Sequence, residues 1–445
     1  MNPARRKSFF AVLLCICLLF SLSVTAFAED AAVAPSFTQL KDPAGEMLAV
    51  SKYGDTKNFP ENSLEGILSA AKNGADMVYV HARKTADGYI VLMADENLSR
   101  MCVDSLGNVV DKNITDVGYH ELSTYHLRAG TGSLHETITA YTVPTLQEVV
   151  AKISGQTLLL LDGAWDFRDE VYDMLVTNNA LNSVVFLASG DKNEVDDWLS
   201  SKSTMPLVIS SYHGNVVFSA RSTVSKTLSA GAVGTLLSTG NAYSVLYQNS
   251  VMSKFENAGR AVIDMTSPDL CGNREDNYLG WNDVTARGYS VIITNNIQEL
   301  CEYFDRVALQ KERLSKNIEA AQAIDVTLCS TDSANALKDA ITEAKAALEG
   351  PCSENSLMQS NYAIQLAMNS LTNRTEDGGS GKTVTTGRIV AAVLVIIAFV
   401  IFEVVFDTLR RKKVRKRRKA LADKRRRMEQ QNFENQKNRK NNLPD

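Results

Sequence analysis

The chain has 445 residues, of which 44% are hydrophobic and 22% are charged, so it is too long for one ordinary domain and is not a wholly disordered chain. Its net charge of −4 conceals a division: residues 408–445 carry 16 Lys and Arg against 4 Asp and Glu, a net +12, and the remainder carries 31 against 47, a net −16. An acidic body with a basic tail excludes a uniform soluble enzyme, and the acidity of the body disfavours nucleic-acid binding there.

The N-terminus predicts a secretory signal peptide over residues 1–28. Arg5, Arg6 and Lys7 precede an apolar run at 9–22, and Ala26-Phe27-Ala28 supplies a small-residue cleavage site. The alternative is an uncleaved membrane anchor, but the apolar run is short for a span. We therefore expect the body to be extracellular.

Residues 46–304 alternate short apolar runs with amphipathic stretches. Strands are expected at 47–50, 77–80, 89–93, 158–161, 184–187, 206–209, 233–237, 261–263 and 290–293. Helices are expected at 62–72, 145–153, 191–200, 243–257 and 298–303. This alternation indicates an α/β fold with a parallel sheet, and eight or nine strands in this length favour a (β/α)8 barrel of the TIM type. A doubly wound open sheet is the alternative, and residues 104–141 are interpreted as an insertion.

The pattern changes after residue 304. Apolar residues at helical spacing predict a small all-α bundle over 305–371, with helices at about 305–324, 332–349 and 354–371. The bundle is interpreted as a stalk, and the alternative is that it binds carbohydrate or matrix. Residues 372–387 have the composition of a polar linker.

A single transmembrane helix is predicted over residues 389–409. These 21 residues would span about 31 Å, which matches a bilayer core of roughly 30 Å. Nine of the next ten residues are Lys or Arg, so the tail at 410–445 is expected on the cytoplasmic side of the cell membrane and the body outside it. The tail either fixes this topology alone or also binds anionic lipid.

Five cysteines follow the expected signal peptide, at positions 102, 271, 301, 329 and 352. They are widely spaced and contain no Cys-x-x-Cys, so neither a zinc site nor a disulfide scaffold is predicted. A bridge between Cys271 and Cys301 is left open, whereas Cys329 and Cys352 flank one predicted helix and are not expected to pair.

Several short motifs follow one another along this part of the chain. They are Pro60-Glu61-Asn62, Gly74-Ala75-Asp76, Asp87-Gly88, Met93-Ala94-Asp95, Val143-Pro144-Thr145-Leu146 and the strand-like run from Gly288 to Asn295. In order and spacing this stretch, residues 46–304, resembles the glycerophosphodiester phosphodiesterase family. The resemblance implies a TIM-type barrel with its site at the C-terminal ends of the strands. The helical segment 305–371 is similar to the FIVAR-type modules of Gram-positive surface proteins.

The resemblance also implies metal-assisted phosphodiester cleavage with two histidines as acid and base. A divalent cation needs carboxylates to hold it, imidazole moves protons near neutral pH, and a guanidinium clamps phosphate oxygens. This chain departs from that pattern. Lys52 and Tyr53 stand where the family has His-Arg, and Tyr79 and His81 where it has the Glu and Asp metal ligands. The remaining departures are Ala94 for the second histidine, and about Leu160 and Asp162 for a Glu and a Lys.

Glu61, Asn62 and Asp95 match the family. The residues expected at the barrel mouth are Lys52, Tyr53, Glu61, Asn62, Tyr79, His81, Asp95 and Asp162. Lys52 is a candidate anion ligand and His81 a candidate base. The plainer interpretation is that His81 fills a pocket and bonds Asp162 or Glu61. No residue is assigned as catalytic or as a metal ligand.

These features predict a membrane-anchored extracellular protein with a catalytically degenerate barrel. It is a phosphoric diester hydrolase by resemblance but is expected to be inactive, and to act as a binding or scaffold protein. No cofactor is expected, and Ca²⁺ or Mg²⁺ would be needed only by an active site. The expected partners are the membrane, anionic lipid at the tail, and a phosphodiester or envelope-polymer ligand. The alternative is an active phosphodiesterase on glycerophosphodiesters or teichoic-acid-like polymers with a rebuilt site.

Overall fold

The computed structural model describes residues 33–133 and 135–373. The expected signal peptide, membrane span and basic tail lie outside these residues, as does almost all of the expected linker. Within the described ranges, no helix combines the length and the apolar sequence that crossing a bilayer requires.

Eight parallel strands close into a barrel, because β1 pairs with both β2 and β11. The barrel strands are β1 (Leu48–Lys52), β2 (Met77–Lys84), β6 (Leu158–Asp162), β7 (Val184–Ala188), β8 (Leu207–His213), β9 (Gly234–Ser238), β10 (Arg260–Asp264) and β11 (Val291–Thr294). This confirms the (β/α)8 barrel and rules out the open sheet. The predicted strand at 89–93 is not a barrel strand, since β3 (Ile90–Leu92) pairs antiparallel to β2.

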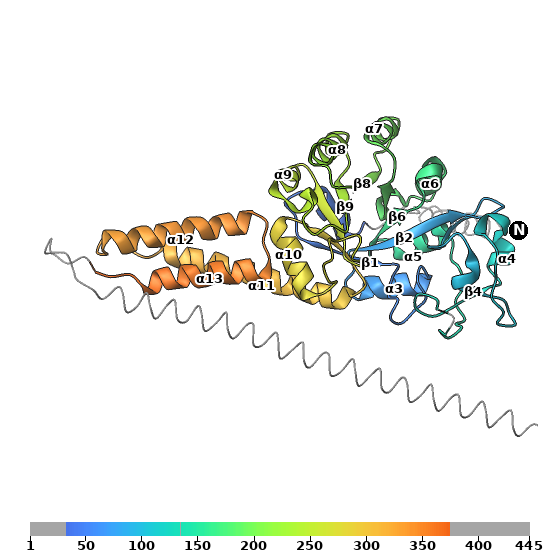
Figure 1. The fold of residues 1–445 in the computed structure, drawn as a ribbon, viewed down its shortest axis with the longest axis horizontal. Coiled ribbons are helices and arrows are strands. Elements are labelled where there is room, and N and C mark those ends of the chain that lie inside the picture. Colours follow the sequence, from blue (N-terminus) through green and yellow to red (C-terminus); the bar gives the residue numbers. More distant parts are fainter. Residues whose placement is uncertain (1–32, 134, 374–445) are drawn as a thin grey trace, which may run out of the picture. The chain divides into compact units, whose positions relative to one another are not determined.

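A helix follows each barrel strand, and Figure 1 shows α6 to α9 outside the strands. The barrel helices are α3 (Leu64–Lys72), α5 (Leu146–Ile153), α6 (Arg168–Thr177), α7 (Lys192–Ser200), α8 (Val217–Ser229), α9 (Asn249–Met252), α10 (Tyr278–Arg287) and α11 (Ile297–Gln322). The predicted helix at 243–257 is wrong as one element. That segment forms only the 3₁₀ turn η5 (Val245–Tyr247) and the four-residue α9.

Local sequence explains these elements. In the apolar run of β6, Leu158 and Leu160 face the barrel interior, whereas Leu159 and Leu161 pack toward the helices. The start of α5 is a capping box. Thr145 N–H donates to Glu148 Oε2 over 2.9 Å, and Glu148 N–H donates to Thr145 Oγ1 over 3.1 Å.

The N-terminal end of the barrel is closed by α2 (Pro35–Lys41), whose Leu40 packs into the barrel's interior cluster. Arg260 opens β10 at this end and is completely buried. Its guanidinium donates to the carbonyl oxygens of Pro43, Gly45 and Glu46, which join α2 to β1. Burial lowers the pKa of Arg260 to about 10, so it stays charged at neutral pH.

An insertion separates β3 from α5 and has a core of its own. It contains η1 (Leu98–Arg100), β4 (Cys102–Val103), η2 (Ile114–Asp116), α4 (Tyr119–Leu122) and β5 (His126–Leu127). The insertion expected from the sequence is therefore present, although its core also includes residues from 91 to 103 and Val143.

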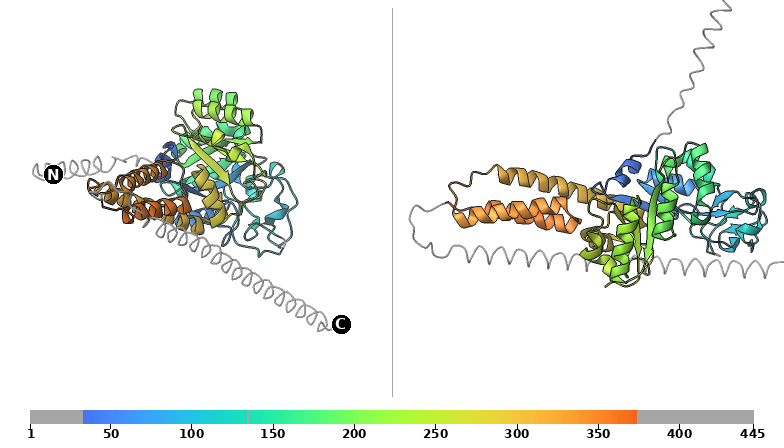
Figure 2. Two further views of the ribbon diagram at one scale, coloured as in Figure 1. Left: turned by 60° about the vertical axis from the view of Figure 1, so that its left-hand side comes forward. Right: turned by 90° about the horizontal axis from the view of Figure 1, so that it is seen from above.

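Three long helices form the bundle: α11, α12 (Thr331–Glu349) and α13 (Glu354–Asn369) lie side by side (Figures 1 and 2). Leu314, Leu337 and Leu357 are among the side chains buried between them. The bundle also contacts α10, because Asn355 accepts a hydrogen bond from Tyr278 Oη over 3.0 Å. The remaining short elements are the 3₁₀ turns η3 (Trp165–Phe167) and η4 (Leu181–Ser183).

The five cysteines within the described residues are all free. The Cys271–Cys301 bridge left open by the sequence is therefore not formed. Instead, Cys271 Sγ lies 3.1 Å from the carbonyl oxygen of Ser267, and Cys301 Sγ lies 3.4 Å from that of Gly74.

Asp76 gives the fold a pH dependence. Its Oδ2 accepts a hydrogen bond from Ala49 N–H over 2.8 Å, and burial raises the pKa of Asp76 to about 6, aided by the charge of Glu46. Between about pH 4 and pH 6 the folded state holds a proton that the unfolded state has lost, so stability falls as the pH rises. Between these pH values, we expect the free energy of unfolding of Asp76→Asn to rise by up to roughly 3 kcal/mol relative to that of the wild type.

Urea unfolding of both proteins at several pH values measures this difference. The exposed Asp196→Asn variant is the control and should follow the wild-type curve. Parallel pH curves for the wild type and Asp76→Asn would contradict the assignment.

Candidate functional site

Charged and polar side chains gather where the barrel strands end. Parallel strands direct their C-terminal ends to one mouth of a barrel, where TIM-barrel sites are built. Lys52 ends β1, Asp162 ends β6 and Asp264 ends β10, each in step with the inward-facing apolar residues before it. Tyr79 and His81 occupy inward positions of β2.

Lys52 and Asp264 form an ion pair at the mouth, with Nζ 2.7 Å from Oδ2. The two side chains are only 13% and 4% exposed. The same Nζ lies 3.7 Å from the ring centroid of Tyr79 and 5.1 Å from that of Tyr53. The two rings meet edge to face, with centroids 5.6 Å apart. Lys52 is therefore surrounded by one carboxylate and two aromatic rings.

Asp162 is the centre of a second set of contacts. Its Oδ2 accepts a hydrogen bond from Tyr79 Oη and lies 3.3 Å from Nδ1 of His81, while Gly163 N–H donates to Oδ1 over 2.7 Å. Burial acts to raise the pKa of Asp162, but the bonds from His81 and Tyr79 outweigh it and lower the pKa. Burial and then the charge of Asp162 raise the pKa of Tyr79 well above its ordinary value, so its hydroxyl remains a donor.

Gly163 has a φ of +73°, and a Cβ there would collide with Nε2 of His81. The glycine thus provides the space that the imidazole occupies beside Asp162.

Glu61 and Asp95 meet through Arg100, which the insertion supplies. Glu61 is 3% exposed and accepts a hydrogen bond from Arg100 Nη2, and Asp95 accepts one from Nε. Burial raises the pKa of Glu61, and Arg100 opposes that shift. Arg100 thereby fastens the insertion to the loop between β1 and α3.

That loop has an unusual backbone. Tyr53 and Asn62 have φ values of +58° and +57°, in a region that Asn tolerates and Tyr rarely adopts. Asn62 N–H donates to the carbonyl of Tyr53 over 2.9 Å, and Tyr53 N–H donates to that of Tyr79 over 2.8 Å. Asn62 Oδ1 accepts from His81 N–H over 3.2 Å, which joins the loop to β2.

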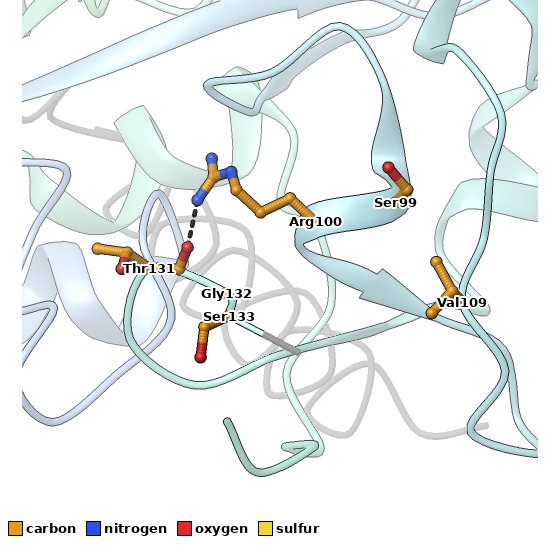
Figure 3. A pocket seen from close by; sticks show the side chains of 6 residues that line it. All are labelled: Ser99, Arg100, Val109, Thr131, Gly132 and Ser133. Atoms are coloured by element: carbon orange, nitrogen blue, oxygen red, sulfur yellow. Dashed lines mark hydrogen bonds between the residues drawn. The ribbon is translucent and has the colours of Figure 1, made fainter. Parts of the chain in front are cut away.

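A hollow of about 470 Å³ lies beside Arg100. Figure 3 shows Arg100 reaching across it to Thr131, whose carbonyl oxygen accepts a hydrogen bond from Nη1. The other lining residues are Ser99, Val109, Gly132 and Ser133. The guanidinium already meets Glu61, Asp95 and Thr131, so it is not a free anion ligand.

The structure divides the sequence-predicted residues into two sets. Lys52, Tyr53, Asn62, Tyr79, His81 and Asp162 are joined at the mouth, whereas Glu61 and Asp95 meet at Arg100. The expected plainer role of His81, a contact with Asp162, is the one observed. The sequence did not suggest Asp264 or Arg100. Asp264 could have been found from the sequence, because it follows a predicted strand as Asp162 does. No sequence pattern pointed to Arg100.

The mouth does not suit a divalent cation. Among the described residues, no group of three or more His, Cys, Asp or Glu stands together to hold a metal ion. Asp264 Oδ2 forms the ion pair with Lys52. Asp264 Oδ1 accepts hydrogen bonds from the N–H of Thr266 over 2.9 Å and from its hydroxyl over 2.6 Å. Ca²⁺ and Mg²⁺ require several free oxygen ligands, which these carboxylates do not provide.

Comparison with known proteins shows which proteins this barrel resembles. Residues 54–232 match the sequence model of the Glycerophosphoryl diester phosphodiesterase family. Over these residues the barrel resembles this family. The bovine glycerophosphodiester phosphodiesterase 1 is 30% identical over 134 residues, which cover 30% of this chain and 38% of the relative. The Bacillus subtilis glycerophosphodiester phosphodiesterase is 26% identical over 132 residues, covering 30% and 44%. The chain thus spans less than half the length of either relative.

Solved glycerophosphodiester phosphodiesterase structures are also similar. One from Parabacteroides distasonis is 17% identical with a TM-score of 0.48, and the match covers 61% of this chain and 92% of that one. One from Thermotoga maritima is 17% identical with a TM-score of 0.44, covering 57% and 97%.

Proposed function

We propose that this protein is a member of the glycerophosphodiester phosphodiesterase family that binds a ligand or acts as a scaffold and does not hydrolyse phosphodiesters by a metal-assisted route. The observation that carries the proposal is that three cationic or imidazole side chains at or beside the mouth are each paired with a carboxylate. Lys52 meets Asp264, His81 meets Asp162, and Arg100 meets Glu61. Groups held in such pairs contribute to the structure of the mouth and are not available to a metal ion.

The expected loss of catalysis is large. Absence of acid–base help costs about 10² to 10⁴ in rate, and absence of a metal removes several kcal/mol of charge stabilisation in the transition state. These losses need not add, because such groups act as a unit. Even the smaller of them would leave little family-type turnover.

The proposal places the barrel on the outer face of the cell membrane. The supporting observations are the apolar run at 389–409, the cations that follow it and the signal-like N-terminus. In this arrangement the barrel and bundle meet a phosphodiester or an envelope polymer outside the cell, while the tail contacts anionic lipid.

One observation favours the alternative, an active phosphodiesterase with a rebuilt site. Asp162 lies against Nδ1 of His81, which is how a carboxylate orients a histidine so that Nε2 can take a proton. A base alone lacks the cation and the phosphate clamp, so we rank this function second.

A hydrolysis assay decides between the two. The full-length chain is incubated with glycerophosphocholine and glycerophosphoglycerol, with Ca²⁺, with Mg²⁺ and with chelator, and the Bacillus subtilis relative serves as positive control. We expect no release of glycerol phosphate above background. Release that His81→Ala abolishes, while the exposed His120→Ala variant retains it, would establish the rebuilt site and overturn the proposal.

A further inference from the structure

The ammonium group of Lys52 lies among one carboxylate and two aromatic rings. Its Nζ lies 2.7 Å from Asp264 Oδ2, 3.7 Å from the Tyr79 ring centroid and 5.1 Å from that of Tyr53. Aromatic faces combined with a carboxylate are the groups by which proteins hold ammonium ligands. The site is largely shielded from solvent, since the Lys52 and Asp264 side chains are 13% and 4% exposed.

The walls of this site are held by bonds that do not involve Lys52. The Tyr79 hydroxyl donates to Asp162, and Thr266 donates to Asp264 Oδ1 from both its N–H and its hydroxyl. The backbone of Tyr53 is fixed by bonds to Tyr79 and Asn62. Loss of the lysine side chain should therefore leave the two rings and the carboxylate in place.

We propose that Lys52 is the built-in occupant of a preformed ammonium site made by Tyr53, Tyr79 and Asp264, and that it excludes other cations from the barrel mouth. The inference rests on the proposed function, in which the mouth works without a metal. Because the ammonium is tethered to β1, its effective concentration at the site is far above that of a free cation. The ammonium group of Lys52 thus supplies the positive charge at the barrel mouth.

The first test is chemical rescue of Lys52→Ala in the full-length protein. This substitution removes three methylene groups and the ammonium, so n-propylammonium is the matching probe. We expect the melting temperature to fall by about 5 °C or more, since Asp264 is left buried without its partner. Propylammonium chloride should restore most of this loss, whereas 1-propanol and equal concentrations of sodium chloride should not.

Two variants sharpen the result. Lys57 is half exposed and pairs with Glu299 at 3.3 Å, so Lys57→Ala is the matched control and should show no response to propylammonium. The double variant Lys52→Ala/Asp264→Asn should lose the response, because it lacks the carboxylate. No selective recovery in a folded Lys52→Ala protein, or equal recovery in the double variant, would overturn the inference.

Two measurements on the wild type remain decisive if Lys52→Ala fails to fold. Reductive methylation followed by mass spectrometry should modify Lys52 at least about tenfold more slowly than Lys57, because its ammonium is paired and shielded. Ca²⁺ should leave the melting temperature unchanged. Equal labelling of the two lysines, or a rise in melting temperature with Ca²⁺, would contradict a self-occupied site.

These outcomes are separable from those of the hydrolysis assay. Turnover by the wild type would overturn the proposed function even if propylammonium rescues Lys52→Ala. An inactive protein without rescue would overturn only the inference about Lys52.

Discussion

Replacement of Arg260 by methionine is expected to lower the free energy of unfolding by about 4 kcal/mol. The guanidinium is completely buried and donates to three backbone carbonyls, those of Pro43, Gly45 and Glu46. Hydrogen bonds from a charged donor contribute about 1.5–3 kcal/mol each, and the cost of burying the charge, which methionine avoids, offsets part of their sum. Methionine fills most of the volume, so the loss reports mainly on these bonds.

Chemical denaturation monitored by tryptophan fluorescence measures this loss. Arg221 lies exposed on α8, so Arg221→Met is the matched control and should change stability by less than about 0.5 kcal/mol. An Arg260→Met protein as stable as this control would show that α2 and the N-terminal end of the barrel do not depend on the buried guanidinium.

The second large effect is expected at Arg100. Its replacement by methionine leaves Glu61, which is 3% exposed, without its cation, and we expect a loss of about 3 kcal/mol at pH 8. Burial already raises the pKa of Glu61, and removal of Arg100 raises it further. Protonated Glu61 does not carry the uncompensated charge, so the variant should recover stability as the pH falls towards 5.

The double variant Arg100→Met/Glu61→Gln isolates this effect. Its glutamine carries no charge, so the double variant should be more stable than Arg100→Met at pH 8 and should not share its gain at lower pH. Thermal unfolding of the wild type and both variants at pH 5 and pH 8 provides the comparison. If Arg100→Met loses the same amount of stability at pH 5 and at pH 8, the effect comes from packing and not from charge.

Much of the barrel could be predicted from the sequence because its strands are short, apolar and regularly spaced. The run at 158–161 is apolar at every position, which is typical of a strand buried on both faces. Helix α8 was not predicted. Its sequence, VFSARSTVSKTLS, is rich in Ser and Thr, which are weak helix formers, and burial of Ala220 and Val224 against the barrel compensates.

The candidate site could be predicted in part for a related reason. Residues at the ends of predicted strands, such as Lys52 and Asp162, can be placed at the mouth from the pattern alone. Arg100 could not be placed, because its partner Glu61 is 39 residues away along the chain and the contact depends on how the insertion folds back. The pairing of Lys52 with Asp264 spans 212 residues and depends on closure of the barrel.

Helix α11 has a consequence for how this protein can be divided. The boundary expected at residues 304 and 305 falls within one continuous helix of 26 residues. Its first turns bury Leu300 and Tyr303 against the barrel and its last turns bury Leu314 and Ile318 in the bundle, within a single hydrophobic cluster. No cut between the two parts leaves both with an intact helix. Barrel and bundle are therefore exchangeable in evolution, and in engineered chimaeras, only as one piece.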